Sequence, residues 1–306
     1  MTALVLGAYA ASPTLHAWDP ALEAEYLAAV TAIEGVDGLE LPWTGQLHPH
    51  DPDWLLANLP RGLRCVVTGI PGTVRALAAD ATLGLASTDE AGRAEALRLA
   101  ARLRDDVARL VDSDRDVTVL AVEVHSAPRR SSGSTDAFAR SLEELAGWDW
   151  SGAAVVVEHC DALVEGQRPE KGYLRLEEEL DAAARAGFGV SLNWGRSAIE
   201  LRDPDAVIRH AERARESGLL RGAILSGAAD RDGALGGAWV DPHHPFSAAD
   251  ATWGDPASVL TAERAAAFFA AAGPLDWRGI KFGWGAAGAP VEQRVAMLRE
   301  AVALLP

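Results

Sequence analysis

Residues 153–192 read AAVVVEHCDALVEGQRPEKGYLRLEEELDAAARAGFGVSL. The apolar run at residues 153–158 has the composition of a strand that is buried on both faces. A helix is predicted over residues 173–186, and Gly187 stands where a helix ends in a left-handed residue. The run FGVSL at residues 188–192 predicts the next strand. Two strands joined by a helix lie parallel, so this stretch predicts a βαβ unit.

The same alternation extends in both directions along the 306 residues. The predicted strands are residues 3–9, 36–41, 63–67, 117–124, 153–158, 188–192, 220–225 and 277–282. The predicted helices are residues 21–34, 51–56, 90–111, 138–145, 173–186, 203–218, 261–273 and 291–302. Asp51, Asp203 and Thr261 are predicted to cap the helices that they begin. Eight such units predict one TIM barrel, a (β/α)8 domain over residues 1–306. A doubly wound sheet is the alternative, but Gly7 stands alone after the first strand and forms no GxGxxG motif.

Composition excludes several classes of protein. Hydrophobic residues make up 49% of the chain, which is enough for a large core. The 28 basic and 44 acidic residues give a net charge of −16, so we expect neither nucleic acid nor a membrane surface as partner. Cys65 and Cys160 are the only cysteines and provide no disulfide framework. Since no basic segment precedes the first apolar run, we expect a cytoplasmic protein.

Polar residues stand at the predicted strand ends. A TIM barrel builds its active site at the carboxyl ends of its strands, so these side chains are expected to converge. One charge at a loop entrance is explained by a salt bridge, whereas a buried set costs several kcal/mol unless partners or a ligand compensate. The strand-end residues are Glu40, Glu123, His125, Glu158, His159, Asp161, Asn193, Ser226 and Lys281.

Tryptophans are frequent in the connections after the strands. Their faces can stack on sugar rings, or they can plug the barrel mouth or form the contact of a homo-oligomer. They are Trp18, Trp43, Trp194, Trp239, Trp253 and Trp284. The residues that we expect to contact a substrate are Glu40, Trp43, His125, Trp194, Arg196 and Trp284.

Histidines near the strand ends are candidate metal ligands. His243 and His244 adjoin Asp241, but adjacent side chains diverge, so one histidine at most is expected to reach the site. Glu158, Asp241 and His243 are therefore the metal candidates. His48 and His50 are expected in a turn, and His210 in a helix with a structural role.

Four stretches resemble the xylose-isomerase-like group of TIM barrels, which contains sugar isomerases and epimerases and the endonuclease IV branch. They are VVVEHCDA (residues 155–162), VSLNWGRSAIE (190–200), SGAAD (226–230) and IKFGW (280–284). The similarity is greatest to a branch known only as a domain of unknown function. The resemblance implies one divalent metal ion with four ligands. These are a glutamate ending strand five, an acidic residue ending strand six, a histidine or aspartate near strand seven and a glutamate ending strand eight. Glu158 matches the first position, whereas Asn193, Ser226 and Lys281 occupy the others.

This departure leaves the cofactor open between none and one divalent ion. Either His243, Asp241 or His125 rebuilds a shifted metal site, or the ammonium of Lys281 replaces the ion. The endonuclease branch is disfavoured by the acidic charge.

The expected function is an isomerase or epimerase of a sugar or sugar-derived acid. Glu158 or Glu123 removes a proton next to a carbonyl, and Lys281 and Asn193 stabilise the enediolate. Three alternatives stay open: a lyase or hydratase on a keto-sugar, a glycosidase that uses Glu123 and Glu158, and a sugar-binding barrel without catalysis.

Overall fold

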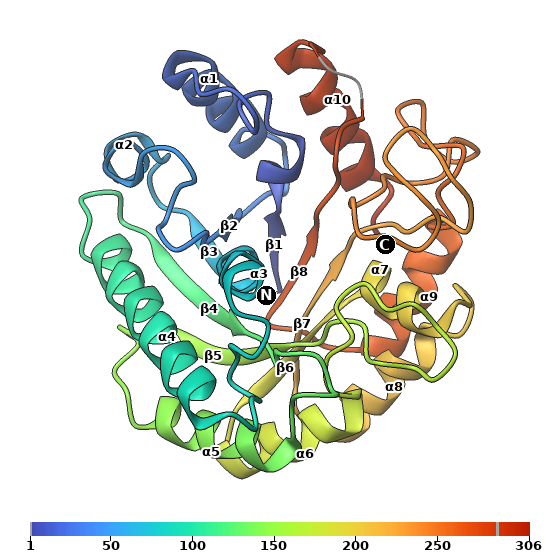
Figure 1. Cartoon of the computed structure of the whole chain (residues 1–306). Coiled ribbons are helices and arrows are strands. Elements are labelled where there is room, and N and C mark those ends of the chain that lie inside the picture. The colour runs from blue at the N-terminus through green and yellow to red at the C-terminus, as the bar shows by residue number, and fades with distance from the viewer. Residues whose placement is uncertain (1, 286–287) are drawn as a thin grey trace.

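The computed structural model describes residues 2–285 and 288–306, in which eight strands close into a parallel barrel in chain order (Figure 1). Pairing of β1 with β8, with Val5 opposite Gly279, closes the sheet. The predicted TIM barrel is confirmed. The strands are β1 (Ala3–Leu6), β2 (Gly38–Pro42), β3 (Arg64–Thr68), β4 (Thr118–Val124), β5 (Ala154–Glu158), β6 (Gly189–Asn193), β7 (Leu220–Leu225) and β8 (Trp277–Ile280).

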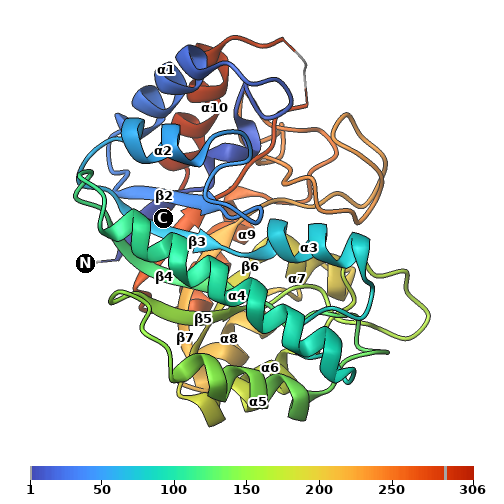
Figure 2. The same cartoon turned by 60° about the vertical axis from the view of Figure 1, so that its left-hand side comes forward.

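Helices surround the barrel, and Figure 2 shows α4 lying along the outside of β4. They are α1 (Pro20–Thr31), α2 (Pro52–Asn58), α3 (Ile70–Ala79), α4 (Glu90–Val111), α5 (Thr135–Ala146), α6 (Leu176–Ala186), α7 (Trp194–Leu201), α8 (Ile208–Glu216), α9 (Ala262–Ala272) and α10 (Val291–Ala303). The predicted caps of α2 and α9 are confirmed, because Asp51 accepts the N–H of Trp54 and Thr261 that of Arg264.

The structure corrects several predicted boundaries. The first strand ends at Leu6, because the chain turns into a 3₁₀ helix at Ala8–Ala11. Helices α3 and α7 were not predicted. The prediction that Asp203 caps a helix is wrong: its carboxylate accepts N–H groups within a turn, and α8 begins only at Ile208.

Two apolar regions position the polar strand ends. Inside the barrel, Val5, Val66, Val156 and Trp277 form a small cluster. The Trp277 ring fills space beside Gly222, where a Cβ atom would lie 2.0 Å from it. A larger apolar layer separates the strands from the helices. The interior beyond this cluster is left for the polar side chains at the carboxyl ends.

Among the helices of residues 2–285 and 288–306, none combines the length and apolar character needed to cross a bilayer.

Candidate active site at the barrel mouth

Lys281 follows β8 and is completely buried among the strand ends. Its Nζ lies 2.7 Å from Oε1 of Glu40, which also accepts the hydroxyl of Tyr9 at 3.2 Å. Gly7 makes room for the lysine, because a Cβ atom at Gly7 would lie 2.7 Å from that of Lys281. Burial favours the neutral amine, but Glu40, Tyr9 and Glu158 together outweigh it and hold the pKa of Lys281 well above its ordinary value. The buried side chain is therefore an ammonium.

Glu158, at the end of β5, is surrounded by cations and donors. Nη1 of Arg196 lies 2.6 Å from its Oε1, and Nζ of Lys281 lies 3.9 Å from the same atom. The other oxygen, Oε2, lies 2.7 Å from Nε2 of His125 and 3.3 Å from the hydroxyl of Thr68. Burial alone raises the pKa of Glu158, but Arg196 and Lys281 outweigh it and hold the pKa well below its usual range.

The pKa of Glu123, on neighbouring β4, is shifted in the opposite direction. Its Oε1 accepts the hydroxyl of Ser191 at 2.8 Å. Burial raises the pKa of Glu123 well above its ordinary value, and the nearby carboxylates of Glu158 and Glu40 raise it further. Two carboxyl groups on adjacent strands of the barrel mouth therefore have pKa values shifted in opposite directions, which is the arrangement of an acid and base pair.

Asp241 extends this charged network from the connection after β7. Its Oδ2 lies 3.1 Å from Nζ of Lys171 and 3.4 Å from Nε of Arg196. His243 approaches Asp241 Oδ1 with its Nδ1 at 3.1 Å, whereas His244 turns away toward Asp255. The predicted divergence of the two histidines is confirmed.

Asn193 has a local structural task. Its Oδ1 accepts the N–H of Gly195 at 3.0 Å, which caps α7, and the hydroxyl of Ser226 at 2.6 Å. This cap fixes the first turn of α7, and that helix carries Arg196 toward Glu158. Asn193 and Ser226, which occupy two of the four positions where the family pattern has metal ligands, are thus hydrogen-bonded to each other.

Three buried polar atoms in this set have neither a hydrogen-bond partner nor an ion-pair partner among residues 2–285 and 288–306. Buried polar atoms are nearly always partnered, so these three are available to polar atoms of a ligand. They are Glu123 Oε2, His125 Nδ1 and Asn193 Nδ2.

Two spaces touch the edge of the cluster, while its centre is closed to solvent. A cavity of about 170 Å³ is bounded by Tyr9 and Glu40 together with apolar side chains from the first two strand connections. A smaller space of about 30 Å³ lies beside Glu123 and His125 and has room for roughly one water molecule.

The three tryptophans that were predicted to contact a substrate lie in the connections after β2, β6 and β8. Trp43 donates its Nε1–H to Asp106 of α4 at 2.8 Å, and Trp194 is completely buried in the layer under the helices. Trp284 is close to Trp253, with ring centroids 5.8 Å apart. Their contacts with a substrate stay predictions.

Sequence reasoning missed Tyr9, Thr68 and Ser191, which bond Glu40, Glu158 and Glu123 respectively. Thr68 ends β3, so the rule that singled out the other strand ends would have found it. Ser191 lies two residues before Asn193, and the alternation of a strand places both on one face.

The donor set at the mouth does not fit a divalent ion. Glu158 is the only carboxylate at the four family positions, and the two cations beside it would repel a metal. Asp241, the other acidic candidate, pairs with Lys171 and Arg196. The positive charges beside Glu158 are those of Arg196 and Lys281.

Comparison with known proteins decides the family. The model of the family described as Domain of unknown function (DUF4862) matches residues 5–297. The chain belongs to the DUF4862 family. The "Uncharacterized protein STM3670" of Salmonella typhimurium is 34% identical to this DUF4862 chain over 310 residues, which cover 99% of the chain and 97% of the relative.

Solved structures share the DUF4862 barrel at low sequence identity. The IOLI protein, crystallised with a bound zinc atom, is 12% identical, with a TM-score of 0.62 and coverage of 100% of this chain and 98% of that one. D-psicose 3-epimerase, crystallised with D-fructose, is 14% identical, with a TM-score of 0.57 and coverage of 99% and 97%. Endonuclease IV from Thermus thermophilus is 17% identical, with a TM-score of 0.54 and coverage of 92% and 93%. At these identities the likeness establishes the fold.

Proposed function

We propose that this protein is an isomerase or epimerase that moves a proton at a carbon next to the carbonyl of a sugar or sugar-derived acid. The observation that carries the proposal is the buried set of unpartnered atoms on Glu123, His125 and Asn193, which lies beside the Glu158 carboxylate and the ammonium of Lys281. Such atoms at the carboxyl ends of barrel strands are where this fold binds and transforms small molecules.

The proposed base is Oε1 of Glu158. It takes the proton from the substrate carbon, the C–H electron pair moves into the carbon–carbon bond, and the carbonyl oxygen becomes an enediolate oxygen. Lys281 and Arg196 stabilise that oxygen, a contribution of roughly 3 kcal/mol for one well-placed donor. As the substrate oxygen gains negative charge, it attracts Lys281 and Arg196 away from Glu158. The Glu158 carboxylate thereby becomes a stronger base in the same step.

Glu123 is the proposed acid. Its protonated carboxyl, on the strand beside Glu158, can return a proton to the intermediate. The two glutamates then exchange protonation states, so the sugar gains and loses one proton overall. Asn193 Nδ2 and His125 Nδ1 are available to hydroxyl groups that hold the substrate in register.

Two observations support a carbohydrate as substrate. D-psicose 3-epimerase, which shares the barrel, was crystallised with D-fructose. Endonuclease IV also shares the fold, but phosphate backbones are repelled by a net charge of −16.

A lyase or hydratase on a keto-sugar is the second candidate. The protonated state of Glu123 favours it, because a general acid can also assist departure of a hydroxyl group as water after the enediolate forms. The product distinguishes the two reactions, since elimination removes a hydroxyl group from the sugar and isomerisation keeps every one.

The test is a panel of ketoses, aldoses and sugar acids incubated with the protein in D₂O and followed by proton NMR. We expect deuterium to enter at the carbon next to the carbonyl. Glu158→Gln is expected to slow exchange by about 10²- to 10⁴-fold. Glu25→Gln, at an exposed glutamate of α1, is the matched control. Exchange that is equal in wild type and Glu158→Gln, or absent with every sugar, would overturn the proposal.

A further inference from the structure

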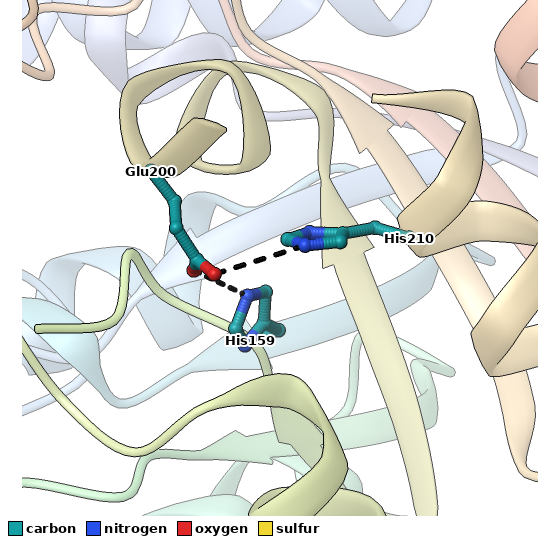
Figure 3. A group of neighbouring side chains, drawn as sticks. All are labelled: His159, Glu200 and His210. Atoms are coloured by element: carbon teal, nitrogen blue, oxygen red, sulfur yellow. Dashed lines mark hydrogen bonds and ion pairs between the residues drawn. The ribbon is translucent and has the colours of Figure 1, made fainter. Parts of the chain in front are cut away.

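A second cluster of ligand-type side chains lies outside the barrel interior (Figure 3). His159 follows Glu158 directly, and strand alternation turns it to the opposite side, toward the helices. There it meets Glu200 of α7 and His210 of α8. Nε2 of His159 lies 3.0 Å from Glu200 Oε2, and Nε2 of His210 lies 3.7 Å from Glu200 Oε1.

A contact of the Nδ1 atom orients the ring of each histidine. Nδ1 of His159 lies 2.6 Å from Oε2 of Glu179, and Nδ1 of His210 lies 3.1 Å from the hydroxyl of Ser197. These bonds leave each Nε2 directed at Glu200 (Figure 3). A carboxylate or hydroxyl behind the distal ring nitrogen is the usual support of a metal-binding histidine.

The spacing between His210 and Glu200 is too long for a hydrogen bond. An imidazole and a carboxylate that face each other without a hydrogen bond leave room for a cation between them. Ligand atoms about 2.1 Å from one ion at a tetrahedral angle lie roughly 3.4 Å apart, between the two observed distances.

We propose that His159 Nε2, the Glu200 carboxylate and His210 Nε2 bind one divalent transition-metal ion of the zinc type. Two imidazoles and one carboxylate are a ligand set that suits zinc. The charges balance, because Glu179 and Glu200 together carry two negative charges against the ion. A metal-bound Nε2 carries no proton, so His159 would bind the ion as a neutral imidazole whose Nδ1 faces Glu179.

The proposed ion links the segments that build the barrel mouth. His159 is the neighbour of Glu158, and Glu200 lies one turn along α7 from Arg196. The Glu158–Arg196 pair inside the barrel and the His159–Glu200 pair outside it thus join the same two segments. The side chains of Glu200 and His210 are 10% and 12% exposed, which gives an ion access. The role that follows is structural support of the mouth.

The test uses the full chain without an affinity tag, stripped by chelator and titrated with ZnCl₂ in a calorimeter. We expect about one ion per chain and a thermal midpoint that rises with zinc concentration. His210→Ala is the informative variant, because His210 lies at the edge of the cluster and its loss leaves the His159–Glu179 pair in place. It is expected to weaken zinc binding by at least about tenfold.

Two control variants make each outcome decisive. His16→Ala removes an exposed histidine and is expected to bind zinc as the wild type does. His243→Ala removes the histidine beside Asp241 and is also expected to keep zinc binding. If the wild type binds no stoichiometric zinc, the inference is overturned. His159 then only links Glu179 and Glu200 by hydrogen bonds. Unchanged binding by His210→Ala, or binding lost only in His243→Ala, would overturn it as well. None of these measurements depends on enzymatic turnover, so they stand apart from the proposed function.

Discussion

Oε1 of Glu158 lies 2.6 Å from the guanidinium of Arg196, and on its other side the ammonium of Lys281 lies 3.9 Å away. In the xylose-isomerase-like pattern a glutamate at this position binds a divalent metal. Here two cations that belong to the chain surround it. The mechanism proposed above is proton transfer in which Lys281 and Arg196 supply the positive charge.

Lys281→Met is expected to slow turnover by about 10²- to 10³-fold, because it removes a donor to the enediolate oxygen. It also leaves Glu40 buried without its cation, and breaking a buried pair costs about 3–5 kcal/mol. Glu40→Gln added to Lys281→Met removes both charges, so we expect stability to recover and turnover to stay low. Urea unfolding and the deuterium assay, applied to both variants, check this.

Recovery of turnover together with stability in the double variant would show that Lys281 serves only the fold. Lys171→Met is the matched comparison, because Lys171 pairs with Asp241 and does not contact Glu158. We expect it to cost less turnover than Lys281→Met.

Glu123→Gln is expected to stabilise the protein while lowering turnover by about 10²- to 10⁴-fold. Burial, reinforced by Glu158 and Glu40, raises the pKa of Glu123, so the folded state holds its proton more tightly than the unfolded chain. Wild-type stability therefore falls as pH rises from about 5 toward that raised pKa. Glutamine mimics the protonated acid and does not titrate, so the difference in thermal midpoint should widen with pH. A difference that is constant from pH 5 to about 8 would contradict the protonated state of Glu123.

Asn193→Ala is expected to destabilise the fold by about 1–2 kcal/mol, because it removes the cap of α7 and the bond from Ser226. Asn193→Asp keeps an oxygen in the capping position, so it should lose less stability than Asn193→Ala. Chemical denaturation of the two variants measures both. Equal losses would mean that the cap does not stabilise α7.

Binding to a DNA duplex is expected to be absent at near-physiological salt, because the chain carries a net charge of −16. Fluorescence anisotropy of a labelled duplex checks this. Tight binding with a steep salt dependence would revive the endonuclease interpretation.

The barrel could be predicted because buried parallel strands are short apolar runs, and all eight runs fall on β1 to β8. Helices α3 and α7 escaped notice because each has a glycine in its first turns and both are short. Gly72 of α3 lies against Trp43, where a Cβ atom would lie 2.7 Å from the ring. Packing, rather than helix propensity, decides such segments.

The site could be predicted in part. The strand-end rule found Glu123, Glu158 and Lys281, because it needs only the strand boundaries. Which cation pairs with which carboxylate depends on side-chain directions that spacing does not specify. His159 was among the predicted strand ends and His210 was expected in a helix, but their meeting with Glu200 was not predicted for the same reason, since the three come from one strand end and two helices of the outer layer.

The most direct test of the central claim measures metal content and deuterium exchange on one sample of chelator-treated wild type that circular dichroism shows to be folded. We predict that exchange next to the carbonyl continues when the ion content is far below one per chain, because the cations at the mouth are Lys281 and Arg196. The claim would be contradicted if exchange stopped on chelation and added divalent ion restored it equally in wild type and His210→Ala. That result would place the ion at the mouth.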